Sequence, residues 1–289
     1  MKATRFAAIL VAVLLGWNTA LAVTIPTVPI GNPGNTTDVR YIDIRHPNGV
    51  GGVTNPFRIG TTEVTNAQYV EFLNAVAGTD TFGLYNDDLG DFTFGGIIRA
   101  GTPGNYTYSV KQDAIGQAPG GSNYSYFDKP AVYVSWFDAL CFTNWLHNGQ
   151  PSGGEDAGTT EDGAYTFTGL ATVGTRNPDA RSWLPSESEW YKAAFYDPAI
   201  GTYYDYPTRT NTPPNNQLPT TDTGNSANFN SNPGCATGNC AFPLTVAGAY
   251  SQSYSAYGTF DQAANVWEWS ETSFTDSFGS WRFIRGGSW

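Results

Sequence analysis

The chain has 289 residues and carries 14 Lys and Arg residues against 25 Asp and Glu residues, for a formal net charge of −11. This acidic balance excludes a nucleic-acid partner from our expectations, because phosphate binding needs clustered Lys and Arg. Aromatic residues make up 15% of the chain and charged residues only 13%, which is unlike a disordered composition and indicates a loop-rich fold held by buried aromatic side chains.

The first 22 residues have the pattern of a secretory signal peptide. Lys2 and Arg5 precede an apolar run over residues 6–17, which is too short to span a bilayer comfortably. The sequence Ala-Leu-Ala at 20–22 then has the small-x-small pattern of a cleavage site. We expect cleavage after Ala22 and a secreted or periplasmic protein, with an uncleaved N-terminal anchor as the alternative. The mature chain contains no later segment apolar enough to cross a membrane.

The mature chain, residues 23–289, is long enough for one large domain. Residues 23–56 are rich in Gly, Pro, Asn and Thr, and we interpret them as an N-terminal lead-in with one strand around Val39–Ile44. The domain proper is predicted over residues 57–289. We find no internal repeat and no break in composition that would divide it.

Three helices are predicted from their capping residues, Thr65, Ser135 and Ser186. Ser186 has Glu189 three residues later, the spacing of a capping box, and Asp138 follows Ser135 in the same way. The helices are expected to end near Leu73 or Val76, to run from about Trp136 to His147, and to end near Phe195.

Short strands are expected between long loops rich in Gly, Asn and Tyr. The candidates are residues 106–110, 164–168, 260–270 and 281–284, with an extended segment at 130–134. Runs of strands and helices do not alternate regularly, so the sequence predicts an α+β fold with about three helices and short strands.

The three cysteines have different surroundings in the sequence. Cys141 lies in an apolar helical pattern, and we expect a buried core thiol there. Cys235 and Cys240 flank a Gly-containing tetrapeptide. Export would permit a disulfide between them, and the spacing leaves both the paired and the unpaired states open.

Several kinds of chemistry can be excluded. His46 and His147 are the two histidines of the chain, so a zinc site built from several histidines is impossible. There is no Gly-x-Ser-x-Gly elbow, phosphate-binding loop or dinucleotide fingerprint. Paired-carboxylate hydrolysis is compatible with the composition, but no spacing points to it.

Five segments together carry a family resemblance. Taken singly, each has a plain explanation; Glu187 and Glu189, for example, suit the first turn of any helix. In this order and spacing they resemble the sulfatase-modifying-factor (formylglycine-generating enzyme) family from about Phe57 to the last residue. The segments are Glu63-Val-Thr-Asn-Ala-Gln-Tyr69, Val134-Ser-Trp-Phe-Asp-Ala139, Trp183-Leu-Pro-Ser-Glu-Ser-Glu-Trp190, Ala264-Asn-Val-Trp-Glu-Trp269 and Arg285-Gly-Gly-Ser-Trp289. The resemblance implies a variant of the C-type-lectin-like fold with little regular secondary structure and short antiparallel strands.

The resemblance also implies structural calcium, which binds carboxylate and carbonyl oxygens. Its ligands map to the side chains of Asp261 and Glu268 and to the carbonyls of Ala264 and Val266. A second site maps less well, to Asn228, Phe229 and Asn239 with the carbonyl of Ala241. Asn239 carries no charge, and a Cys235–Cys240 disulfide is the alternative means of holding that loop.

The enzyme of this family oxidises a sulfatase cysteine to formylglycine with O₂ and copper. Its catalytic cysteine pair begins just after the Gly-Gly-Ser-aromatic stretch, where this sequence stops at Trp289. None of the three cysteines matches the catalytic positions, and Ser288 matches a serine beside the active site. We therefore expect a fragment that stops short of the family's C-terminus, with copper bound only if the cysteine pair lies beyond Trp289.

The sequence is compatible with two candidate functions. The first is a non-catalytic exported domain that binds a protein or glycan ligand through the long loops at 79–129 and 197–257. The alternative is a formylglycine-generating oxidase whose catalytic cysteines are missing from the sequence. An iron-dependent oxygenase related to sulfoxide synthases is disfavoured, because those enzymes take histidine ligands from an additional domain.

Overall fold

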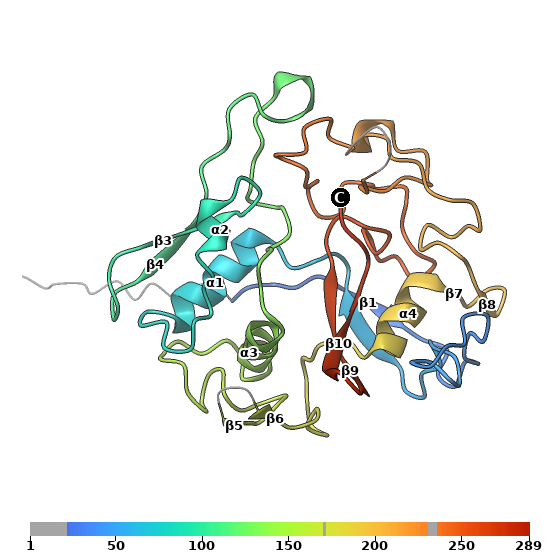
Figure 1. The fold of residues 1–289 in the computed structure, drawn as a ribbon, viewed down its shortest axis with the longest axis horizontal. Helices are drawn as coiled ribbons and strands as arrows, with labels where there is room; N and C mark the ends of the chain where they lie inside the picture. Colours follow the sequence, from blue (N-terminus) through green and yellow to red (C-terminus); the bar gives the residue numbers. More distant parts are fainter. Residues whose placement is uncertain (1–21, 170–171, 231–235) are drawn as a thin grey trace, which may run out of the picture.

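A computed structural model describes residues 22–169, 172–230 and 236–289. Within them lie four α-helices and ten strands, so the fold is mixed α+β, as predicted (Figure 1). Single turns of 3-10 helix are found at Pro119–Gly121 and Pro219–Thr221. The helices are α1 (Asn66–Val76), α2 (Asp88–Asp91), α3 (Trp136–His147) and α4 (Glu187–Phe195).

The ten strands pair two by two in antiparallel ribbons. The ribbons are short because Gly- and Asn-rich turns interrupt the chain every few residues, except at the C-terminal pair. The pairs are β1 (Thr27–Ile30) with β2 (Phe57–Gly60), β3 (Ile97–Ala100) with β4 (Thr107–Val110), β5 (Phe167–Gly169) with β6 (Thr172–Val173), β7 (Tyr196–Asp197) with β8 (Thr202–Tyr203), and β9 (Glu268–Asp276) with β10 (Gly279–Arg285).

The three predicted helices are confirmed, together with their caps. Thr65, Ser135 and Ser186 each accept a hydrogen bond from the backbone N–H three residues later, and the side chain at that position bonds back to the cap. Such a capping box satisfies donors that the start of a helix leaves open. The sequence does not reveal α2, because four residues are too few to show a helical period.

Aromatic side chains form most of the core between α1 and α3. Phe72 of α1 is fully buried and lies 5.3 Å from Phe142 and 5.4 Å from Trp145 of α3, between ring centroids. Figure 1 shows α1, α2, α3 and the β3–β4 ribbon in one half of the molecule and α4, β1 and β7–β8 in the other, with β9–β10 between them. The core is therefore supplied by helices and loops rather than by a large sheet.

The β9–β10 ribbon connects the two halves. Trp269 of β9 donates its indole N–H to the carbonyl of Val134, just before α3, at 2.9 Å. On the other side, Thr272 Oγ1 accepts the backbone N–H of Glu187 at the start of α4, also at 2.9 Å. β9 is thus fixed to the segment before α3 and to the start of α4. The predicted calcium ligands lie in the loop that precedes β9 and at its first residue, Glu268.

Some predicted strands are wrong or displaced. Residues Val39–Ile44 form turns, and their apolar side chains face solvent; Val39 is 58% and Ile44 84% exposed. The predicted strand at 260–270 begins only at Glu268, and the one at 164–168 is shifted to 167–169. Tyr133, with φ 57°, interrupts the predicted extended segment at 130–134. No helix in the described part of the chain is long and apolar enough to cross a membrane.

Candidate metal centre

The loop before β9 turns at two non-glycine residues in the left-handed region, Asp261 (φ 60°) and Asn265 (φ 65°). Asp and Asn adopt this conformation more readily than other side-chain-bearing residues, because their short polar groups bond locally. The turn prevents the loop from continuing as a strand. Its carbonyl oxygens are therefore free of a β-ladder and face the glycine pair that follows β10.

Three predicted calcium ligands converge on this glycine pair. A Cβ atom built on Gly286 would lie 2.9 Å from the Val266 carbonyl oxygen, 3.7 Å from Glu268 Oε1 and 3.9 Å from the Ala264 carbonyl oxygen. Gly286 has φ 98°, a conformation that residues with side chains rarely adopt. The absence of a side chain there lets the three oxygens face a common point.

Glu63, which precedes α1, brings a further carboxyl group to the loop. Its side chain contacts that of Asp261, and the negative charges of Asp261 and Glu268 act on it. Burial raises the pKa of Glu63 and Asp261 above their ordinary values, and raises the pKa of Glu268 to about 7. The charges of neighbouring carboxylates add to this effect for Glu63 and Glu268, so three carboxyl groups are crowded in a buried site.

Asn265 holds this group of residues together. It is 1% exposed, and its Nδ2 donates to Glu63 Oε1 at 2.9 Å, while its Oδ1 accepts from Asn228 Nδ2 at 2.9 Å. Glu63 Oε2 is buried and has no hydrogen-bond partner. A buried carboxylate oxygen left unpaired is costly, and a cation at this position would satisfy it.

The donor set fits calcium. Ca²⁺ accepts six to eight oxygens in a flexible geometry, whereas Zn²⁺ prefers His and Cys and Mg²⁺ keeps several waters. Among the described residues, no group of three His, Cys, Asp or Glu side chains could hold a metal alone, so binding would depend on the backbone carbonyls. Calcium bound by Asp261, Glu268 and the carbonyls of Ala264 and Val266 stays a prediction, and the structure adds Glu63 as a further candidate ligand.

The residues of the second predicted calcium site have separate partners. Asn228 is buried and donates to Asn265, so it supports the first site. Asn239 is bonded to the Ala241 N–H near the surface, and Phe229 is half-buried. Within the described ranges, no hydrogen bond joins Asn228 to Asn239. This second site also stays a prediction.

The two cysteines that the structure describes are held in states that suppress their reactivity. Cys141 is a free thiol, 4% exposed, whose Sγ lies 3.7 Å from Glu161 Oε1. Burial, with the charge of Glu161, raises the pKa of this thiol far above its usual range, so the predicted core thiol is confirmed. Cys240 is disulfide-bonded, while Cys235, its predicted partner, lies outside the described residues.

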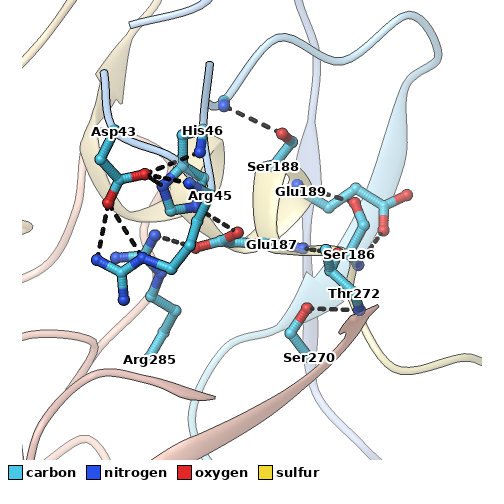
Figure 2. A network of polar contacts seen from close by, with 11 residues as sticks. Asp43, Arg45, His46, Ser186, Glu187, Ser188, Glu189, Ser270, Thr272 and Arg285 are labelled. Carbon is cyan, nitrogen blue, oxygen red and sulfur yellow. Dashed lines mark hydrogen bonds and ion pairs between the residues drawn. The ribbon is translucent and has the colours of Figure 1, made fainter. Parts of the chain in front are cut away.

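A second group of acidic residues lies at the start of α4 and is arranged differently (Figure 2). His46 lies between two carboxylates, with Nδ1 2.9 Å from Asp43 Oδ1 and Nε2 2.8 Å from Glu187 Oε2. Arg285 of β10 pairs with the other oxygen of Glu187, and Arg45 with the other oxygen of Asp43 at 2.7 Å. We call these five residues the α4 network. Each of its carboxylates faces basic side chains of the protein itself.

Comparison with known proteins identifies the family. The family model for the sulfatase-modifying factor enzyme 1-like domain matches residues 25–289. The chain belongs to this family.

Two individual proteins are similar to the chain. Hercynine oxygenase from Mycobacterium tuberculosis is 26% identical over 254 residues, covering 81% of this chain and 45% of the relative. The chain therefore spans less than half the length of this curated relative. The crystal structure of CarF matches with a TM-score of 0.51 over 92% of this chain and 87% of CarF, at 19% identity. This second likeness shows the fold alone.

The last signature segment of the family, residues 285–289, lies against the loop before β9. The Trp289 N–H donates to the Asn265 carbonyl at 3.2 Å, and a Cβ on Gly287 would lie 3.7 Å from Ala264 Cα. Ser288, between them, is half-buried. The segment that the family resemblance places beside a catalytic site therefore also forms one wall of the candidate metal centre.

Sequence reasoning assigned no role to Glu63 or Asn265, although both lie in the quoted signature segments. Their contact joins positions 202 residues apart, and no spacing rule connects such positions. One usable signal was the position of Glu63 shortly after the apolar segment 57–60. Burial is expected there, and a buried carboxylate needs a partner.

Proposed function

We propose that this protein is an exported, calcium-stabilised binding domain with a C-type-lectin-like variant fold, and that it does not oxidise thiols with its own cysteines. The state of these cysteines carries the proposal. Thiol chemistry requires an accessible thiolate, whereas Cys141 is buried with a strongly raised pKa and Cys240 is disulfide-bonded. Neither can serve as a copper-binding or reactive thiolate.

Export is supported by the signal-peptide pattern over residues 1–22. The family match starts at residue 25, just after the expected cleavage site. The first described segment also belongs to the fold, since the Val23 N–H donates to Gln150 Oε1 at 2.6 Å. A leader followed directly by folded chain is the arrangement that export predicts.

Calcium would act structurally in this proposal. Glu63, Asp261 and Glu268 would supply carboxylate oxygens, and Ala264 and Val266 their carbonyls. The ion would contribute the positive charge that offsets three crowded carboxylates. The loop before β9 would then be fixed, and with it the connection between the two halves of the molecule.

A protein or glycan ligand is the proposed target of the domain. The segments between α1 and α3 and between β8 and β9 are long and rich in Tyr, Asn and Gly, and their described parts contain only short helices and strands. Such loops on a rigid scaffold commonly carry binding functions.

The decisive experiment is an oxidation assay on the protein expressed from its complete gene, including any residues that follow Trp289, because the oxidase alternative places its cysteine pair there. The protein is incubated with copper, O₂ and a synthetic sulfatase peptide that contains the target cysteine, and the peptide mass is followed. We expect the peptide to remain unmodified. Formation of formylglycine would reject the proposal in favour of the oxidase alternative. A Cys141→Ser variant is the matched control, and hercynine is included as a second substrate because one relative is a hercynine oxygenase.

A further inference from the structure

A cavity of about 800 Å³ lies between the β1–β2 ribbon, the end of α3 and the segment that precedes α4. It shares Phe57 and Trp183 with a neighbouring cavity of about 500 Å³. It also shares Ile59, Leu146 and Trp183 with an inner apolar cavity of about 260 Å³. Since Trp183 borders all three, we call the largest of these three the Trp183 cleft. Its volume lies within the range of known ligand sites.

The floor of the Trp183 cleft is apolar and rigid. Ile25, Ile59 and Leu146 line it together with Trp183. The indole N–H of Trp183 donates to a Glu189 carboxylate oxygen at 3.4 Å, and a guanidinium lies 4.8 Å from the ring centroid. The ring is therefore held by Glu189 in the first turn of α4 and by Arg176, which precedes Trp183 in the chain, while it still borders the cleft.

The rim is basic, although the chain as a whole is acidic. Among the residues that the structure describes, Arg58 of β2 and Arg181 are the charged ones that line the cleft, and none of the lining residues is Asp or Glu. Arg58 bonds to Thr27 and Arg181 to the His147 carbonyl. Neither has a carboxylate partner in the described part of the chain. Five other arginines do have such partners, namely Arg40, Arg45, Arg99, Arg176 and Arg285.

We propose that the Trp183 cleft binds an extended segment of a partner protein in which acidic residues flank an apolar one. The inference rests on the proposed binding function, but it places the binding site in this cleft and outside the two long loop segments. The apolar side chain packs on Trp183 and Ile59, and the carboxylates pair with Arg58 and Arg181. Guanidinium groups suit carboxylates because their N–H fork matches the two oxygens.

A peptide suits the cleft better than a saccharide. Sugar hydroxyls need several open amide or carboxylate groups, whereas this floor is hydrocarbon. The amide of the cleft, Gln150, is already bonded on both sides to the Val23 backbone, at 2.6 and 2.8 Å. An apolar side chain between two carboxylates meets the apolar floor and the two cationic rim groups together.

The test is fluorescence anisotropy with the full chain and a fluorescein-labelled peptide of alternating Glu and Leu. We expect saturable binding that weakens as salt is added, because the rim charges are exposed. Arg58→Gln and Arg181→Gln should each weaken binding about tenfold, as expected for losing a hydrogen-bonded charge. The same peptide with Gln in place of Glu should bind less tightly to the unsubstituted protein.

Arg209→Gln is the matched control, because Arg209 is exposed, forms no salt bridge among the described residues and does not line the cleft. It should bind the Glu-Leu peptide as the unsubstituted protein does. Absence of binding, or an equal loss in Arg209→Gln, would overturn the inference. Binding of polygalacturonate in place of the peptide would also overturn it, in favour of a glycan, and would leave the proposed binding function intact. The oxidation assay separately tests whether the protein oxidises thiols.

Discussion

The α4 network and the candidate metal centre gather carboxylates in opposite ways. In the network, Glu187 is 4% exposed at its side chain and faces both His46 and Arg285. In the metal centre, Glu63 and Asp261 contact each other, and every charge that shifts the pKa of Glu63 is negative. Buried carboxylates without a compensating charge are unfavourable. The charges of the first group are balanced by basic side chains of the protein, whereas the described contacts of the second group include no basic side chain, which is why we propose a cation there.

Calcium removal should produce the largest contrast between the two groups. At a hundredfold excess over its dissociation constant, one bound ion stabilises the folded state by about 2.7 kcal/mol. A chelator should then lower Tm by roughly 5–10 °C, measured by differential scanning calorimetry. Glu63→Gln and Glu268→Gln should abolish the calcium-dependent shift, whereas Glu187→Gln should retain it. A Tm that is indifferent to calcium would contradict the assignment of the metal centre.

Breaking the α4 network should destabilise the protein whether or not calcium is present. Glu187→Ala leaves His46 and Arg285 without their shared acceptor. Breaking a buried ion pair destabilises a protein more than breaking an exposed one. The Glu187 side chain is 4% exposed and that of Arg285 is 28% exposed. We therefore expect an intermediate loss of about 2–3 kcal/mol in unfolding free energy. Urea unfolding measures it. The more exposed Asp43 is the control, since Asp43→Asn should have the smaller effect; an equal loss would mean that burial does not set the cost.

Gly286 offers a way to disturb the metal centre without changing charge. In Gly286→Ala, the new Cβ would lie 2.9 Å from the Val266 carbonyl oxygen, at φ 98°. We expect a loss of about 2 kcal/mol in unfolding free energy from strain and crowding, together with weaker calcium binding by calorimetry. Gly287→Ala is the control, because its φ of 115° is also unfavourable but its nearest neighbour is 3.7 Å away. Equal calcium affinities would argue against convergence of the oxygens at Gly286.

Asp38 is another buried acid whose charge is balanced by partners within the protein. Burial favours its neutral form, but hydrogen bonds from Arg40 and Tyr191 outweigh this effect, and the pKa of Asp38 is lowered. A lowered pKa contributes stability above the unfolded value of about 3.9, and this contribution is lost as the pH falls. Asp38→Asn should therefore cost about 1 kcal/mol at pH 6 and less at pH 3, by urea unfolding at both values. A cost independent of pH would contradict the charged role of Asp38.

Local signals predicted the helices well. Thr65, Ser135 and Ser186 each combine a capping side chain with a partner three residues later, so sequence neighbours alone fix these helix starts. The strand predicted at Val39–Ile44 failed for the opposite reason. Its β-prone residues are exposed in a turn segment, and only the tertiary structure decides which apolar residues find a partner.

The candidate site was predictable only in part. Family resemblance placed Asp261 and Glu268 with two carbonyls, and the structure brings Glu268 Oε1 and these carbonyls to Gly286. Glu63 could not be added, because it comes from a segment some two hundred residues away. The Trp183 cleft could not be predicted from the sequence either. Its walls come from β1, β2, α3 and the segment before α4, and no periodic pattern connects these segments.

The five signature segments of the family bond to one another. Segment 264–269 is the hub: Asn265 bonds to Glu63, Trp269 to the Val134 carbonyl, and Glu268 to the indole of Trp190. The last segment joins it through the Trp289 N–H. These motifs therefore record how the scaffold is assembled rather than which reaction it performs. Trp183, the first residue of one segment, also borders the proposed ligand cleft, so a segment that helps to assemble the scaffold also shapes its binding surface.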